Sequence, residues 1–131
     1  MQNCKNKMND LILIGRHISL VSPDYLYGSL RKAISYGSNS LMIYLGSPQN
    51  IFRKPVSELK VNEFKNLLEE SNLNIDNVLV HGPYLVNFGN IINEKKLFWS
   101  KQFLKSEISR MEEIGLKTLI IHPGISLGKD K

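Results

Sequence analysis

Short apolar runs recur along the chain and are separated by longer stretches of mixed character. The runs occupy residues 11–14, 41–45, 78–80 and 119–121, and glycine stands at or shortly after the end of each. None of these runs alternates apolar and polar residues. They therefore predict four strands that are buried on both faces.

Between the runs, apolar residues recur at helical spacing, which predicts helices over residues 24–36, 61–71 and 94–114. Gly37 and Gly115 directly follow the first and third of these stretches and are candidate helix ends. The expected core faces carry Leu26, Leu30, Ala33 and Ile34 in the first helix, Phe64, Leu67 and Leu68 in the second, and Leu97, Leu104, Ile108 and Met111 in the third.

The order strand–helix–strand–helix–strand–helix–strand predicts an α/β fold with a parallel sheet and right-handed crossovers. An open doubly wound sheet and part of a (β/α)8 barrel both fit this order. A complete barrel takes about 250 residues, whereas this chain has 131 and stops soon after its fourth apolar run. We expect a polar leader over residues 1–10, followed by an incomplete TIM-barrel domain over residues 11–131.

Composition narrows the class of protein. Hydrophobic residues make up 42% and charged residues 22%, as in soluble globular domains. No apolar run approaches the roughly 20 residues of a membrane-spanning helix, and one cysteine excludes an internal disulfide and a cysteine-based zinc site. Seventeen Lys and Arg against 12 Asp and Glu give a net charge of +5, which favours a polyanionic partner.

All three histidines stand at the carboxyl end of a predicted strand: His17, His81 and His122. In a parallel sheet these ends share the edge at which ligands bind. A single histidine there can simply bond to a backbone carbonyl. Three together favour a metal or catalytic site, because imidazole is the commonest metal ligand. No acidic residue stands at a strand end to complete the ligand set.

Two loops on the same edge carry further candidates. Tyr84 follows the third strand, within HGPY, where it could contact a base or a sugar or pack under the loop. Residues 46–55 follow the second strand, and composition alone allows either a solvated loop or a phosphate-binding one. The side chains in this segment that could reach DNA are Gln49, Asn50, Arg53 and Lys54.

Four segments together carry a resemblance to a known family. They are residues 15–19 (GRHIS), residues 36–50 with their YG and PQN ends, residues 80–87 (VHGPYLVN) and residues 112–124 (EEIGLKTLIIHPG). In order and without large gaps, they resemble the N-terminal half of endonuclease IV, the zinc-dependent apurinic/apyrimidinic endonuclease of base-excision repair.

The resemblance implies a TIM barrel with three zinc ions at the carboxyl ends of its strands. His81 and His122 match two ligands of one zinc, and His17 matches a histidine near the cluster that is not a direct ligand. Tyr84 and the Gln49–Asn50 pair match parts that enter the DNA minor groove. Such enzymes are cytoplasmic, bacterial-type monomeric hydrolases. They act on double-stranded DNA with abasic sites and cleave the phosphodiester 5′ to the lesion, leaving a 3′-hydroxyl and a 5′-deoxyribose phosphate.

The sequence also departs from the family. Ser126 stands where many members have a second histidine, and the family's carboxylate and remaining histidine ligands come from strands that these 131 residues do not include. At most one partly liganded zinc is then expected, and the isolated chain should be inactive and prone to self-association. Two alternatives stay open: a truncated, non-catalytic DNA-binding remnant, and a barrel of the sugar isomerase or epimerase kind.

Overall fold

The computed structural model describes residues 12–71 and 73–126, so the expected polar leader over residues 1–10 lies outside the described part. The strands are β1 (Gly15–His17), β2 (Ser40–Ile43), β3 (Val78–His81) and β4 (Thr118–Ile120). The helices are α1 (Tyr25–Ser35), α2 (Val61–Glu70) and α3 (Glu94–Ile114), with short 3-10 turns η1 (Val56–Glu58) and η2 (Ile75–Asn77).

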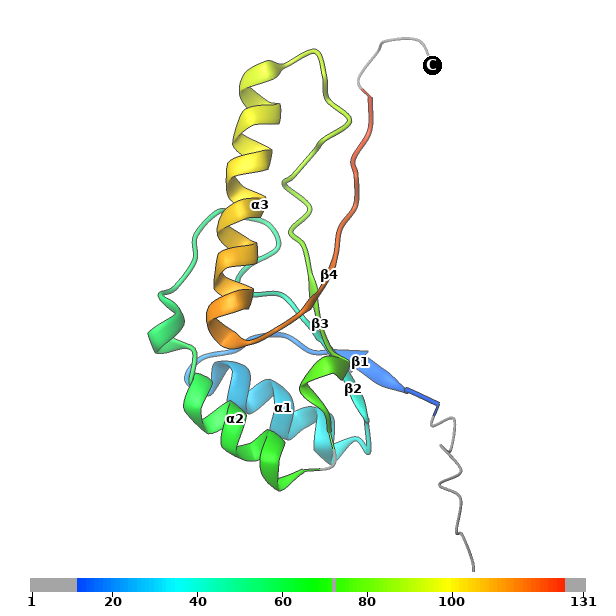
Figure 1. Ribbon diagram of the computed structural model, residues 1–131, viewed down its shortest axis with the longest axis vertical. Coiled ribbons are helices and arrows are strands. Elements are labelled where there is room, and N and C mark those ends of the chain that lie inside the picture. The colour runs from blue at the N-terminus through cyan, green and yellow to red at the C-terminus, as the bar shows by residue number, and fades with distance from the viewer. Residues whose placement is uncertain (1–11, 72, 127–131) are drawn as a thin grey trace, which may run out of the picture.

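The four strands form one parallel sheet in the order β1-β2-β3-β4. Helices α1 and α2 lie side by side, and the longer α3 runs beside the segments that follow β3 and β4 (Figure 1). The prediction of an α/β fold with four parallel strands and three helices is confirmed.

The two faces of the sheet differ in burial. Leu41 and Ile43 of β2 and Val78 and Val80 of β3 are fully buried, in one core with residues of α1, α2 and α3. The alternate residues point to the other face, because side chains along a strand alternate, and among them Ile120 is 38% exposed. The prediction of strands buried on both faces is therefore wrong, because the described helices cover one face only.

The first strand lies later in the chain than its apolar run predicts. Ile12, Leu13 and Ile14 are 77%, 53% and 68% exposed, and β1 begins at Gly15. Pairing with β2 starts at Gly15 and Ser40. Immediately before that point, the Ile14 N–H donates to the Asn39 side chain at 2.7 Å instead of to a strand partner. The apolar run therefore approaches the sheet without joining it.

Helix ends follow the expected chemistry. Gly37 and Gly115 have φ of +69° and +94°, the left-handed conformation that glycine adopts easily. At the start of α3, the Asn93 side chain accepts a hydrogen bond from the Lys96 N–H at 3.0 Å. Among the described residues, no helix has both the length and the apolar character needed to cross a membrane.

The buried face of α3 differs from the predicted one. Ile108 is 48% exposed, Leu97 and Leu104 are half-buried, and only Met111 of the predicted set is buried. In their place the helix buries Ser100, Glu107, Met111 and Ile114. The helix is turned so that Glu107 faces inward, where an arginine neutralises its carboxylate. Ile34 of α1 is likewise 37% exposed, although Leu26, Leu30 and Ala33 are buried as predicted.

Candidate functional site

Strand register places the candidate histidines on one face of the sheet. His17 pairs with Met42, which pairs with Leu79. His81 lies two residues beyond Leu79 and pairs with Ile120, and His122 lies two residues beyond Ile120. Because every offset is an even number of residues, the three histidines project from the same face, the one that the helices leave open.

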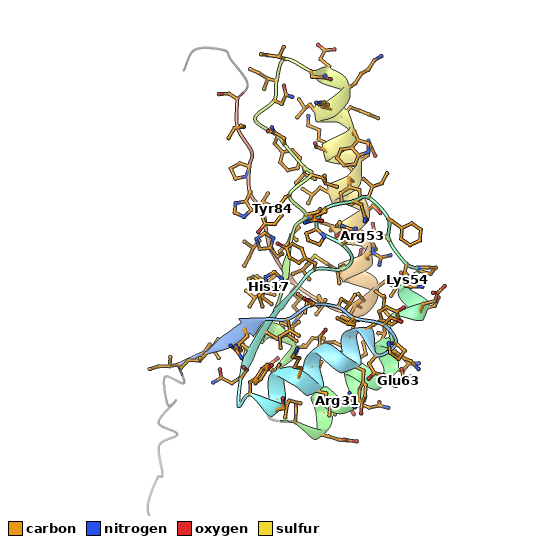
Figure 2. The ribbon with its side chains drawn as sticks, turned by 180° about the vertical axis from the view of Figure 1, so that it is seen from behind. His17, Arg31, Arg53, Lys54, Glu63 and Tyr84 are labelled. Carbon is orange, nitrogen blue, oxygen red and sulfur yellow. The ribbon has the colours of Figure 1, made fainter. Side chains whose placement is uncertain are left out.

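The three histidine rings and two tyrosine rings form one cluster, which we call the histidine cluster: His17, Tyr44, His81, Tyr84 and His122. The ring centroids of His81 and His122 are 5.1 Å apart, and those of His17 and His81 are 5.9 Å apart. Tyr84 lies 5.4 Å from His81 and 5.5 Å from His122, between centroids. Figure 2 shows His17 and Tyr84 on the same side of the molecule. The structure thus brings the predicted residues together, with His81 and His122 closest among the histidines.

The hydrogen bonding of His81 leaves one of its ring nitrogens available. The side chain is buried, and its Nδ1 lies 2.7 Å from the Gly82 carbonyl oxygen. A carbonyl oxygen can only accept, so Nδ1 carries the proton and donates it. In the neutral ring, Nε2 then keeps a free lone pair. This is the arrangement by which metal-binding histidines are commonly oriented.

Two other members of the cluster have shifted pKa values. The pKa of His17 is lowered, first by burial and then by the neighbouring His81. The pKa of Tyr44 is raised to about 12 by burial, by a side-chain hydrogen bond with Tyr84 and by the charge of Tyr84. Both shifts favour uncharged side chains near neutral pH. Tyr44 was missed by the sequence analysis, because within an apolar run it looks like a core residue.

The described residues do not complete a metal site. Within residues 12–71 and 73–126, no group of three or more His, Cys, Asp or Glu side chains is arranged to hold a metal ion. The roles of His81 and His122 as ligands, and of His17 as a neighbour of the site, stay predictions.

The segments that follow β3 and β4 are joined by hydrogen bonds close to the cluster. The Phe88 and Gly89 N–H groups donate to the Pro123 carbonyl at 2.9 and 3.1 Å. The Asn87 side-chain oxygen accepts from the Asn90 N–H and the Ile125 N–H, both at 3.1 Å. These bonds fix the chain after His81 beside the chain after His122.

The segment after β2 presents two of the predicted DNA-binding residues. Gln49 and Asn50 are exposed, and so is the Lys54 side chain, which pairs with Glu58 at 2.9 Å. The prediction that Arg53 could reach phosphates is wrong. Its side chain is 8% exposed and its Nε donates to Glu107 at 2.8 Å, which leaves it engaged inside the protein.

A cavity of about 580 Å³ lies beside the cluster, and His17, Tyr44, Asn50 and Lys54 are among its lining residues. It therefore adjoins both the end of β1 and the segment after β2. The exposed tyrosine, the loop amides and this cavity share the edge on which the histidines stand.

Comparisons with known proteins identify the family and the fold. Residues 30–131 match the family described as "Xylose isomerase-like TIM barrel", and the chain belongs to that family. Within it, the chain is 42% identical over 121 residues to "Probable endonuclease 4" of Ureaplasma parvum, and the match covers 92% of this chain and 39% of that protein. "Probable endonuclease 4" of Bacillus subtilis is 37% identical over 118 residues, covering 90% of this chain and 39% of the relative.

A solved structure also shares the fold. Endonuclease IV from Thermus thermophilus superposes with a TM-score of 0.73 at 24% identity, over 85% of this chain and 40% of that one. The predicted TIM-barrel class and the predicted resemblance to endonuclease IV are confirmed. The chain spans about two fifths of the length of these relatives.

Proposed function

We propose that this chain is part of a zinc-dependent endonuclease of base-excision repair. The whole enzyme cleaves the DNA phosphodiester 5′ to an abasic site and leaves a 3′-hydroxyl and a 5′-deoxyribose phosphate. The observation that carries the proposal is the convergence of His17, His81 and His122 with Tyr84 at one edge of a parallel sheet. The 42% identity to a probable endonuclease 4 supports it. A monomeric enzyme of the bacterial cytoplasm is part of the same proposal.

The imidazoles of His81 and His122 are suitable ligands for zinc but do not make a complete ligand set. His81 offers its free Nε2, and the His122 ring lies 5.1 Å away between centroids, so the two imidazoles can share one ion. His17 lies beyond His81 and lines the cavity. A catalytic zinc site normally uses three protein ligands, so His81 and His122 supply part of a set that needs further residues. When bound, zinc supplies Lewis-acid chemistry for phosphodiester hydrolysis.

The chain's own contribution to binding is to hold damaged DNA at this edge. Tyr84 is 63% exposed and can enter the minor groove beside the lesion, where its ring replaces stacking that the missing base no longer provides. Gln49 and Asn50 supply exposed amides, and the net charge of +5 favours the phosphate backbone. An abasic nucleotide also costs less to extrude from the duplex than an intact one.

The test is a chimera in which this chain replaces the matching part of the Ureaplasma parvum relative. We expect incision 5′ to the lesion in a labelled abasic duplex, with activity lost on chelation of zinc. His81→Ala and His122→Ala should each lower activity by more than the roughly 10- to 100-fold that loss of a hydrogen-bond partner of a metal ligand costs. Lys117→Ala, which removes an exposed ion pair with Asp76, is the matched control and should retain activity.

The alternatives give different results. A chain that binds abasic DNA but yields an inactive chimera would favour the non-catalytic remnant. Aldose–ketose isomerisation without incision would favour the isomerase kind. The isolated chain, with its partial donor set, should neither incise abasic DNA nor bind zinc tightly.

A further inference from the structure

Side chains of the segment of residues 46–54, between β2 and η1, hold it from within: Ser47 Oγ and Asn50 Oδ1 accept from the Gln49 and Phe52 N–H groups, and the Arg53 guanidinium bonds to several of its carbonyls. The carbonyl oxygens of Ser47, Asn50 and Phe52 lie 3.1, 3.1 and 2.9 Å from Arg53 Nη1, whose two N–H groups are therefore shared among three acceptors. These three carbonyls belong to the segment itself. The guanidinium therefore replaces the strand or helix hydrogen bonds that the segment lacks.

Glu107 of α3 fixes the guanidinium in turn. Its carboxylate accepts from Arg53 Nε at 2.8 Å, and its side chain is 1% exposed. The Phe103 ring lies 4.9 Å from the Arg53 guanidinium, and Arg110 donates to the Leu45 carbonyl at 3.4 Å. Figure 2 shows Arg53 between this segment and α3. The segment is thus attached to α3 through one buried ion pair.

The energetics of the pair indicate a role in conformation more than in stability. Within the described part of the chain, Arg53 Nη2, Glu107 Oε2 and Arg110 Nε are buried without a hydrogen-bond partner. Buried charges with unsatisfied atoms gain little net stability over apolar residues of the same size. They do specify one arrangement, because moving Glu107 would leave the Arg53 guanidinium buried without a carboxylate, and moving Arg53 would leave Glu107 with only Arg110, whose Nε lies 3.8 Å from Glu107 Oε1.

Gly46 supplies independent support. A Cβ at this position would lie 2.7 Å from Arg53 Cδ and 2.8 Å from Arg53 Nη1. The first residue of the segment therefore has no side chain where the guanidinium passes. The Gly46 backbone and the Arg53 side chain are therefore in close contact, which a larger residue at position 46 would prevent.

We propose that Arg53 and Glu107 are positioning residues: together they hold residues 46–54 in the conformation that presents Gln49 and Asn50 beside the histidine cluster. Neither touches DNA. The inference deepens the proposed function, since it assigns the alignment of that DNA-binding segment to a glutamate on the far side of the segment. Hydrogen bonds and burial alone support the role of Arg53 and Glu107 in holding residues 46–54.

Amide hydrogen exchange on the full chain tests the proposal. Arg53→Ala should speed exchange of the Gln49 and Phe52 N–H groups several-fold, because these donate to side chains within the segment, while α1 and α2 exchange as before. Added ethylguanidinium should restore protection, and ethylammonium should not, because only the planar fork can bond several carbonyls and Glu107 together. Met111→Ala, which removes a buried side chain one turn away on α3, is the control for general destabilisation.

Unchanged exchange in Arg53→Ala, equal rescue by both cations, or the same selective opening in Met111→Ala would overturn the proposal. If Arg53→Ala does not fold, Gly46→Ala carries the test, because it displaces the guanidinium without removing a charge. Gly46→Ala should open the same segment selectively, and unchanged exchange there would overturn the proposal.

A measurement of abasic-duplex binding distinguishes this inference from the proposed function. Ethylguanidinium should restore the abasic-duplex affinity of Arg53→Ala together with segment protection. If the segment responds as expected but the chimera neither binds nor incises abasic DNA, the proposed function fails and the positioning role is supported.

Discussion

The Asn87 side-chain oxygen lies where the segments after β3 and β4 meet, and its removal should loosen the histidine cluster. This oxygen accepts from Asn90 N–H and Ile125 N–H at 3.1 Å each. It is the one side-chain acceptor shared by the two segments among the hydrogen bonds of the described residues. Asn87→Ala removes both bonds and leaves the backbone bonds to Pro123 in place.

The magnitude follows from the burial of the two donors. Each neutral hydrogen bond contributes about 0.5–1.5 kcal/mol. Ile125 is 66% exposed, so water can replace the lost acceptor there, whereas Asn90 is 4% exposed and its N–H would stay unsatisfied. We therefore expect Asn87→Ala to cost about 1–2 kcal/mol of unfolding free energy, which for a chain of this size lowers Tm by about 3–8 °C.

Asn87→Asp is the matched control. A carboxylate keeps an acceptor oxygen in the same place, so this variant should lie close to the unsubstituted chain at neutral pH. The assay is thermal and urea unfolding of this chain followed by circular dichroism, with zinc affinity measured in the chimera by competition with a chromophoric chelator. Equal destabilisation by Ala and Asp, or an Ala variant as stable as the unsubstituted chain, would refute the role assigned to the oxygen.

Three further outcomes are expected. In the complete enzyme or the chimera, Tyr84→Ala should weaken abasic-duplex binding by about 10- to 100-fold through lost stacking, and equal losses on undamaged DNA would indicate mere loop stability instead. The isolated chain should self-associate through the exposed apolar residues before β1. The double variant Leu13→Lys, Ile14→Lys should shift the mass measured by sedimentation toward the 15.0 kDa of a monomer. An unchanged mass would exclude these residues as the contact. The pKa of the Glu63 carboxyl is lowered from its ordinary value of 4.5 by a backbone hydrogen bond and by Lys60. The ionised carboxylate therefore stabilises the folded chain at pH values above 4.5, and this stabilisation is lost as the pH falls through the lowered pKa. Glu63→Gln should thus be slightly less stable than the unsubstituted chain at neutral pH in urea unfolding, with the gap closing on acidification, and a widening gap would contradict the assignment.

Elements with locally determined ends could be predicted from the sequence. Helices α1 and α3 end within a residue or two of Gly37 and Gly115, as expected from the left-handed conformation that these glycines adopt. The apolar runs located β2, β3 and β4. The run before β1 misled the prediction because its pairing partner, which begins at Ser40, decides where that strand starts.

The buried ion pair was beyond sequence reasoning for a related reason. Glu107 interrupts the apolar pattern of α3 and therefore looked like a solvent-facing residue. It is buried beside Arg53, 54 positions earlier, which neutralises its carboxylate, and Arg110 Nε lies 3.8 Å from the same oxygen. Hydrophobic periodicity describes one element at a time. It cannot show that two charged residues on different elements pair with each other and are both buried.

Residues of the candidate site are held in place in two different ways. The histidines and Tyr44 are set by strand register, because even offsets along paired strands fix the face on which they project. Gln49 and Asn50 are set by side-chain hydrogen bonds that centre on Arg53. Since breaking the Arg53–Glu107 pair leaves the strand ladder intact, the segment of residues 46–54 should loosen before the histidine cluster does. Binding of damaged DNA and affinity for zinc should therefore separate in Arg53 variants, whereas Asn87→Ala, which acts on the segments that follow β3 and β4, should affect both.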